Sequence, residues 1–333
     1  MFLKHKTVLA ATVVAGMLPG SLAAQEEWML GSVGAPGSAL AAMGDMVAEA
    51  MTEASDGEFT IERQFIGNEQ EMVQQVLRGR VQVGATSSQG LGVVVPEQSV
   101  LAFPFLWGSQ EEMEYVIANH AKPVLAELMA AQGLQLLAVG DAGFYGVFCR
   151  FDCHDPASLE GERVRVSPTP PANLFWEVRG ANRVQMPISE LWPGLEQNLV
   201  SAADIPFPFY LTTPAAESAP HFINTNHFHA PWIFFTSQRT WSGLSEEQQQ
   251  AIIDGLPSQG ELFVEIQREL SAARDRFADM GGHFYEVDAE MDAAWRDGVE
   301  ERLPELLEDM GSGAARLYQA IQDGKAEFAA QQD

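Results

Sequence analysis

The sequence of 333 residues carries little positive charge, and this limits what the protein can bind. It has 19 Lys and Arg against 46 Asp and Glu, which gives a formal net charge of −27. A surface this acidic repels phosphate groups, so binding of nucleic acid through the general surface is excluded. Any anion must bind in a local positive pocket that works against the charge of the whole chain. Each buried arginine is therefore informative.

The sequence also lacks the local motifs of several common enzyme classes. It contains no His-Glu-x-x-His, no Gly-x-Ser-x-Gly and no phosphate-binding glycine loop. An enzyme would have to catalyse its reaction through residues scattered along the chain. A non-catalytic protein without a cofactor is the preferred interpretation, and an exported enzyme is the alternative.

Long apolar runs are missing except near the N-terminus. There, Lys4 and Lys6 precede an apolar stretch that ends in small residues. This is the layout of a secretory signal, with cleavage expected near Ala23 or Ala24. The stretch is too short and too interrupted by proline and glycine for a membrane span, although an uncleaved anchor is an alternative. We expect residues 1–24 to be removed, leaving a periplasmic protein with a net charge of −29.

Cysteine is almost absent, since the chain holds only Cys149 and Cys153, in the run FCRFDCHD. An exported protein reaches a compartment where disulfides form. Three intervening residues make a tight loop, so we predict a bond between the two cysteines. Two metal ligands, with His154 as a third, are the alternative. No second cluster of cysteine or histidine lies nearby to complete such a site.

Hydrophobic periodicity predicts an α/β fold. The first third of the chain alternates strands and helices, as an open α/β sheet does. Ser87 lies just past the end of the third strand, where such sheets bind ligands, although a simple capped turn fits equally well. The expected elements are a strand at 27–33, a helix at 39–54 with Ser38 as its N-cap, a strand at 59–64, a helix at 68–77 and a strand at 81–86.

The pattern restarts after residue 155 and echoes the first part. Both halves have a helix that ends at a residue able to adopt a left-handed conformation, Gly79 in one and Asn198 in the other, followed by a strand of small residues. We therefore expect two α/β domains that face each other across a cleft. The second domain would present Asp204 to the first. Its expected elements are strands at 163–166, 183–186 and 200–205 and helices at 171–179 and 190–197.

Three further segments complete the prediction. Residues 109–132 are expected to form one helix, and residues 136–141 and 144–148 two strands. Residues 221–236 are expected to form paired strands that return to the first domain. In them His227 and His229 alternate onto one face, which suits either a metal pair or, preferably, two structural histidines. A helix from 259 to 280 could span about 30 Å, the width of a small domain.

The run Arg163-Val164-Arg165-Val166 follows Gly161 and predicts a short strand. Valines would hold this strand in an apolar layer while an arginine points away from it. The planar donor fork of arginine matches the two oxygens of a carboxylate, so a fixed arginine is a suitable clamp. Two solvated arginines on a surface strand are the alternative.

The order and spacing of several segments resemble one protein family. The chain is similar to the extracytoplasmic solute receptors of tripartite ATP-independent periplasmic (TRAP) transporters, of the dicarboxylate-receptor type. The segments that carry the resemblance are GNEQEMVQQVLRGRVQVGATSS, VVPEQSVLAFPFLW, DPASLEGERVRV, GANRVQMPISELWPGLEQNLVSAADIP, the strand of His227 and WSGLSEEQQQAI.

The resemblance implies a two-lobed periplasmic-binding-protein fold, with a ligand cleft between two α/β domains and a long helix behind both. The expected first lobe contains residues 25–147 and 237–280, including the long helix. The expected second lobe contains residues 148–236 and 281–333, with the C-terminal helices. Such a receptor would be a monomer that hands its ligand to TRAP membrane permease subunits. A sensor subunit for a membrane kinase shares this fold and is an alternative.

The family pattern also implies site residues. Arg165 occupies the position of the arginine that binds the ligand carboxylate, and Arg163 lies two residues earlier on the same strand. Phe209 matches an aromatic residue of the site, and His227 matches a histidine near it. Two departures matter, because Tyr145 stands where many members have a second arginine, and Ile205 stands where many have asparagine. We therefore expect a monocarboxylate with hydroxyl or apolar character, and not a dicarboxylate.

Overall fold

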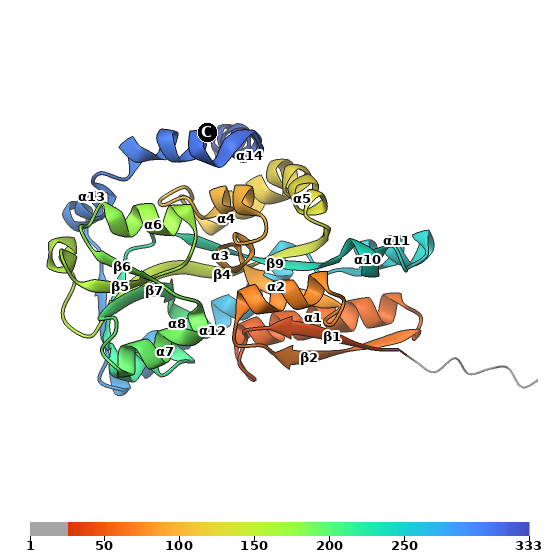
Figure 1. Ribbon diagram of the computed structural model, residues 1–333, viewed down its shortest axis with the longest axis horizontal. Coiled ribbons are helices and arrows are strands. Elements are labelled where there is room, and N and C mark those ends of the chain that lie inside the picture. Colours follow the sequence, from red (N-terminus) through yellow and green to blue (C-terminus); the bar gives the residue numbers. More distant parts are fainter. Residues whose placement is uncertain (1–25, 333) are drawn as a thin grey trace, which may run out of the picture.

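The structure is a computed structural model that describes residues 26–332. The expected signal peptide lies outside these residues. Figure 1 shows two α/β lobes side by side, connected by strands and helices that run across both. Eight strands follow one another in the order β2-β1-β3-β9-β4-β7-β5-β6, and β8 and β10 branch off at β4. The predicted two-lobed α/β class is confirmed.

The first lobe is built on a parallel set of three strands. β1 (Glu26–Ser32) pairs with β2 (Phe59–Phe65) on one side and with β3 (Val83–Ser87) on the other. Helix α1 (Ala39–Ala54) begins where the Ser38 side chain accepts a hydrogen bond from the Ala41 N–H, and its apolar face is buried. Helix α2 (Glu69–Leu77) is capped in the same way by Asn68. The predicted capping of α1 by Ser38 is confirmed.

Beyond β3 the chain forms short helical pieces. They are α3 (Ser88–Leu91), η1 (Pro96–Ala102), α4 (Gln110–Val116), η2 (Ile117–Ala121) and α5 (Lys122–Ala131). The single helix predicted over residues 109–132 is divided by η2, a π-helical turn. The reason is Pro123, which has no N–H to donate and forces the preceding turn to widen.

The second lobe repeats the design of the first. Its strands are β5 (Arg163–Val166), β6 (Asn182–Gln185) and β7 (Ala202–Pro206), and its helices include α6 (Pro170–Glu177), α7 (Ile188–Glu196), α8 (Phe207–Leu211) and α9 (Ala215–Ser218). The turn before β7 places Asn198 at φ 57°, and the matching turn before β3 places Gly79 at φ 71°. The predicted echo between the lobes is therefore confirmed.

One long strand joins the two sheets. β4 (Leu134–Cys149) pairs with β9 (His229–Ser237) in its first part and with β7 and β8 (His221–Asn224) in its last part. The sequence predicted two strands here. They form one strand with a bulge between Asp141 and Phe144, where Gly143 has φ 89° and donates its N–H to Asp141 Oδ1 at 2.7 Å.

β9 is the second crossing strand, and it corrects the predicted boundary between the lobes. It pairs with β3 of the first lobe as well as with β4. The strands predicted over residues 221–236 were expected to pair with each other. Instead β8 and β9 each pair with β4, and β8 also pairs with β10 (His283–Glu286). Alternation of apolar residues identifies a strand but does not identify its neighbour.

The C-terminal third supports both lobes. After α10 (Gln238–Trp241) and α11 (Glu246–Gly255), helix α12 (Gln259–Asp279) contacts α1 in the first lobe, β4, and α8 and β10 in the second. The long helix predicted behind both lobes is present. Among residues 26–332, none of the helices has both the length and the apolar character required to cross a bilayer.

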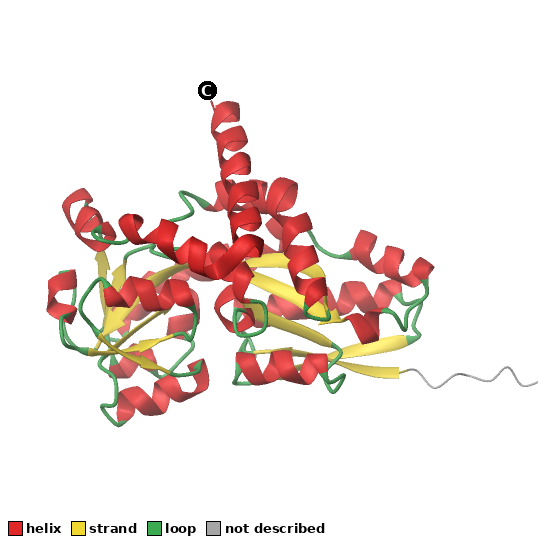
Figure 2. Cartoon of the chain, turned by 45° about the horizontal axis from the view of Figure 1, so that its top comes forward, coloured by secondary structure: helices red, strands yellow, loops and turns green. Residues whose placement is uncertain are grey.

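The last helix belongs to the other lobe than predicted. After α13 (Ala289–Arg296) and η4 (Glu300–Arg302), α14 (Leu303–Gln332) packs against η1, α4, η2 and α5 of the first lobe, with a kink at Gly311. Leu317 and Ile321 are fully buried in the same core as Val116. Figure 2 shows the end of this helix projecting from the body. Its amphipathic pattern indicated an apolar face but gave no information about the lobe that covers it.

The predicted disulfide is present between Cys149 and Cys153, both fully buried. It closes a short loop at the end of β4. In the chain-entropy model, a loop this short stabilises the fold by about 2 kcal/mol. We expect Cys149→Ala/Cys153→Ala to lower the free energy of unfolding in urea by about that amount. Dithiothreitol should lower the stability of the wild type similarly and leave the double variant unchanged. Equal stability of the two oxidised proteins would contradict this prediction.

Candidate functional site

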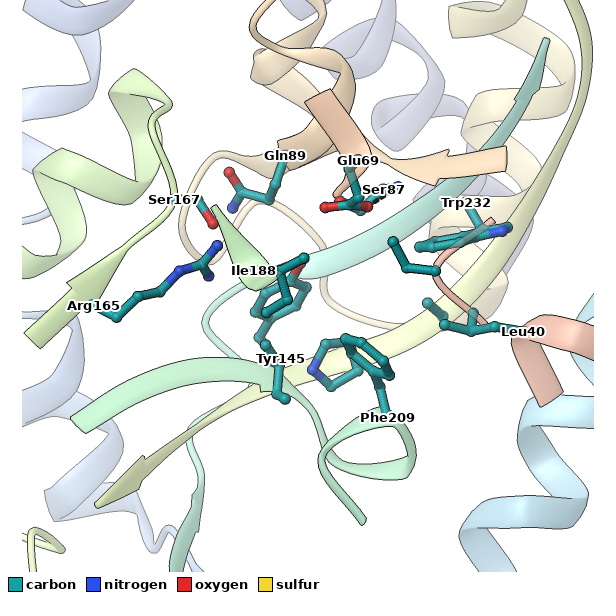
Figure 3. Close-up of a pocket in the computed structure, with 14 residues that line it drawn as sticks. Leu40, Glu69, Ser87, Gln89, Tyr145, Arg165, Ser167, Ile188, Phe209 and Trp232 are labelled. Atoms are coloured by element: carbon teal, nitrogen blue, oxygen red, sulfur yellow. Dashed lines mark hydrogen bonds between the residues drawn. The ribbon is translucent and has the colours of Figure 1, made fainter. Parts of the chain in front are cut away.

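A pocket lies between the lobes, at the carboxyl ends of β3 and β7 (Figure 3). Side chains from both sheets line it, as expected for a ligand site in an open α/β fold. The first lobe contributes Glu69, Ser87 and Gln89, and the second contributes Arg165 and Phe209.

Arg165 supplies the positive charge of the pocket. It lies on β5 between two valines, is only 3% exposed, and its Nε donates to the carbonyl oxygen of Met186 at 3.1 Å. Its Nη atoms have neither a hydrogen-bond nor an ion-pair partner within residues 26–332. Burial lowers the pKa of Arg165, but a guanidinium keeps its proton in proteins. The pocket therefore offers two donors of a buried cation to an incoming anion.

Gln89 adds a neutral donor near this cation. Its Oε1 accepts a hydrogen bond from Thr169 Oγ1 at 2.5 Å, and its Nε2 is buried without a partner in the part of the chain that the structure describes. Figure 3 shows the amide on the same side of the pocket as the Arg165 guanidinium, with Ser167 close to both. A carboxylate bound to Arg165 could accept a further hydrogen bond here. An unpaired buried donor costs free energy until a ligand satisfies it.

An acid, Glu69, faces the pocket from the first lobe. Its Oε1 accepts hydrogen bonds from Thr86 Oγ1 and from the Ser87 N–H, both at 2.9 Å. Its Oε2 accepts none from the described residues. No local pattern indicates this role, because Glu69 follows the helix cap Asn68 and looks like an ordinary acid of a first helical turn.

Ser87 has both of the roles that the sequence left open. Its Oγ accepts from the Gly90 N–H at 3.1 Å and so caps α3, and the residue also lines the pocket. Tyr145 also lines the pocket and is only 6% exposed. Burial, and then the negative charges of Glu69 and Asp204, raise the pKa of Tyr145. Its hydroxyl is therefore protonated at neutral pH and can donate a hydrogen bond.

Apolar side chains form the remaining wall. Phe209 and Trp232 lie near the far end from Arg165, together with Leu40 (Figure 3). Ile188 and Ile205 line the pocket as well. The amide that many family members carry at the position of Ile205 is thus replaced by an apolar surface. The pocket has a cationic end, a polar acidic side and an apolar wall.

Two of the sequence candidates lie behind this pocket and do not line it. His227 Nε2 is 3.3 Å from Asp204 Oδ2, and Asp204 Oδ1 accepts from Trp176 Nε1 at 3.2 Å. The His227 ring stacks on Phe175 with a centroid distance of 3.9 Å. Both His227 and Asp204 are fully buried. They form a packed polar layer that supports the strands carrying the site.

This layer predicts a dependence of stability on pH. Burial lowers the pKa of His227 below its usual value near 6.5, against the opposing effect of Asp204. Below pH 6.5 the unfolded chain binds a proton at His227, whereas the native state does not. The free energy of unfolding therefore falls as the pH decreases. We expect His227→Gln to reduce the loss of unfolding free energy between pH 7 and pH 5, measured in urea. An identical loss in variant and wild type would contradict this.

Arg163 lies outside the pocket, contrary to the possibility that it reaches the cleft. It is exposed, and its Nη2 donates to the carbonyl oxygen of Asn198 at 2.5 Å. Alternation does place Arg163 and Arg165 on one face of the strand. However, Arg163 lies about 7 Å nearer the amino end, and the pocket lies at the carboxyl end.

The two neighbouring histidines do not form a metal pair. His229 Nε2 is 3.2 Å from Asp141 Oδ2, whereas His227 contacts Asp204. Within the described chain no group of three or more histidine, cysteine or acidic residues is arranged to hold a metal ion. Each histidine lies beside an acid of its own, Asp204 for His227 and Asp141 for His229, which the sequence did not predict.

The chain is similar in sequence to known solute-binding proteins. The 2,3-diketo-L-gulonate-binding periplasmic protein YiaO of Escherichia coli is 26% identical over 196 residues, which is 59% of this chain and 60% of that protein. The chain thus matches about three fifths of the length of this relative. The solute-binding protein RD1_1052 of Roseobacter denitrificans is 25% identical over 92% of this chain and 96% of its own.

Solved structures share the fold. A TRAP periplasmic solute-binding protein from R. denitrificans with bound β-D-glucuronate has a TM-score of 0.79 at 23% identity, over 88% of this chain and 99% of that one. The sugar acid binding protein DctPAm of Advenella mimigardefordensis, in complex with galactonate, has a TM-score of 0.84 at 20% identity, over 91% and 98%. The model of the family DctP, bacterial extracellular solute-binding protein family 7, matches residues 30–309. The chain therefore belongs to the family 7 extracellular solute-binding proteins, the receptors of TRAP transporters.

Proposed function

We propose that this receptor captures a hydroxylated monocarboxylate, of the sugar-acid class, between its lobes. The observation that carries the proposal is Arg165, a buried guanidinium on a rigid strand whose Nη atoms have no anionic partner in the described chain. A bidentate carboxylate satisfies those donors and compensates the desolvated charge. Gln89 Nε2 provides a third donor at the same end.

The opposite side of the pocket selects against a second carboxylate. Glu69 presents a negative oxygen there, and Tyr145 replaces a cation with a neutral hydroxyl. Ligand hydroxyls can donate to Glu69 and can bond to Ser87 and Tyr145. Similar receptors were solved with β-D-glucuronate, galactonate and β-D-galacturonate, which are hydroxylated acids. The chemistry of this pocket fits that class.

We propose further that the mature protein acts in the periplasm as a monomer and delivers its ligand to TRAP membrane permease subunits. The N-terminal signal and the family membership support this assignment. The same family membership favours a binding role over catalysis, so a bound acid should be recovered chemically unchanged.

A thermal-shift screen tests the ligand class. D-Glucuronate, D-galactonate and D-galacturonate should raise the melting temperature, since a ligand at 100 times its Kd adds about 2.7 kcal/mol of stability. D-Glucose, which has hydroxyls but no carboxylate, is the matched control and should give no shift. The proposal fails if no acid stabilises the protein, or if glucose stabilises it equally.

A further inference from the structure

We propose that Thr169 and Gln89 form a latch across the cleft, which holds the lobes closed and aims the Gln89 amide at the ligand carboxylate. Gln89 belongs to α3 of the first lobe and Thr169 to the loop after β5 of the second. Their hydrogen bond, from Thr169 Oγ1 to Gln89 Oε1, can exist only when the lobes are together. This inference rests on the proposed function, because it assigns a positioning role at the same site.

The Thr169 side chain lies at the start of helix α6 without making a capping bond. Thr169 is the N-cap residue of α6, where a threonine side chain usually accepts a hydrogen bond from the second or third helical N–H. The helix begins with Pro170 and Pro171, so the second N–H does not exist. The Thr169 side chain makes no capping bond, and its hydroxyl donates to Gln89. The consecutive prolines also fix the direction in which the loop presents the hydroxyl.

The Gln89 amide has one orientation in the structure. Thr169 Oγ1 donates to Gln89 Oε1, so the amide oxygen faces Thr169. The amide nitrogen is then left toward the Arg165 side of the pocket, buried and without a partner in the described chain. Gln89 is 3% exposed and Thr169 1%, so water cannot readily replace either group. Closure therefore completes the anion site, with one donor contributed across the cleft.

The first lobe leaves space for Thr169. Gly92 ends α3 with ordinary helical angles, φ −58° and ψ −18°. A Cβ atom added to it would lie 2.9 Å from Thr169 Cγ2 and 2.5 Å from Ser99 Oγ. No strain in the backbone requires glycine at this position; a side chain there would collide with Ser99 in the first lobe and with Thr169 across the cleft. Residues of both lobes thus allow the contact, Gly92 in the first lobe and Thr169 in the second.

The test compares Thr169→Val, which keeps the shape and removes the hydroxyl, with Thr169→Ser, which keeps the hydroxyl. In stopped-flow fluorescence, D-glucuronate should dissociate about tenfold faster from Thr169→Val than from the wild type. The reason is that a buried hydrogen bond is lost and its acceptor is left unpaired. Serine should restore the wild-type rate. Gly92→Ala should speed dissociation in the same direction without removing any hydrogen-bonding group. A wild-type dissociation rate in the valine variant would overturn the latch.

Small-angle X-ray scattering without ligand separates this proposal from the proposed function. Because the hydrogen bond joins the two lobes, its loss should favour an open arrangement, so Thr169→Val should have a larger radius of gyration than the wild type, and Thr169→Ser should not. If none of the three sugar acids binds even the wild type, the ligand class is wrong, and the scattering comparison still decides on the latch. Equal radii of gyration for Thr169→Val and the wild type would contradict the latch.

Discussion

Arg165→Ala is expected to weaken the binding of a sugar acid by a factor of about 30 or more. Removing one partner of a buried charge pair typically costs about 2–5 kcal/mol, and 2 kcal/mol corresponds to about thirtyfold in Kd. The loss should be large here because Arg165 is 3% exposed, so water cannot take over the role of the guanidinium. Isothermal titration calorimetry with D-glucuronate measures the effect directly.

The matched control is Arg163→Ala, on the same strand and two residues away. Arg163 is exposed and bonded to the Asn198 carbonyl, so its loss should leave the affinity unchanged. Arg165→Lys should fall between alanine and wild type, since lysine keeps the charge but lacks the two-pronged donor. Urea unfolding of each variant verifies that the fold is intact. Equal affinity of Arg165→Ala and wild type would remove the basis of the proposed site.

Local patterns in the sequence predicted what depends on neighbours along the chain. The cap at Ser38, the left-handed turns at Gly79 and Asn198 and the strand that carries Arg165 follow from residues within a few positions of one another. The same patterns could not predict partners. Helix α14 shows an apolar face in its sequence, but only packing reveals that the first lobe covers it.

For the residues of the site, too, local patterns could not predict which side chains come together. Glu69 looks like an ordinary acid at the start of a helix and carries no local signal of ligand binding. Gln89 follows the end of the third strand, where such sheets bind ligands, but nothing local marks its amide as a donor to the ligand. They become informative only when folding brings them to a buried arginine 76 or more positions away. Arg163 illustrates the reverse error, because alternation gives the face of a strand but not the end at which a pocket opens.

Glu69→Gln is expected to change the selectivity of the pocket between a monocarboxylate and a dicarboxylate. D-Glucuronate and D-glucarate have the same six carbons and both carry a carboxylate at C6. D-Glucuronate closes into a pyranose ring with a neutral hemiacetal at C1, whereas D-glucarate is open and has a second carboxylate there. When one carboxylate binds Arg165, the other end of D-glucarate approaches Glu69, where two negative charges repel each other. Wild type should therefore prefer D-glucuronate.

Glutamine keeps the oxygen that accepts from Thr86 and Ser87 at 2.9 Å and removes the charge. D-Glucuronate should bind about fivefold more weakly, because a ligand hydroxyl then meets a neutral acceptor and loses about 1 kcal/mol. D-Glucarate should bind about tenfold more tightly, since a repulsion of about 1.4 kcal/mol disappears. The ratio of the two Kd values should thus change about fiftyfold in calorimetry.

Glu71→Gln makes the same change of charge two residues along α2, at an exposed position outside the pocket. It should leave both Kd values unaltered, so a matching shift there would mean that the overall charge of the protein sets selectivity. An unaltered ratio in Glu69→Gln would mean that the far end of the ligand does not reach this acid. A fiftyfold change confined to Glu69 would instead show that one buried carboxylate, which no local motif marks, determines how many charges the ligand can carry.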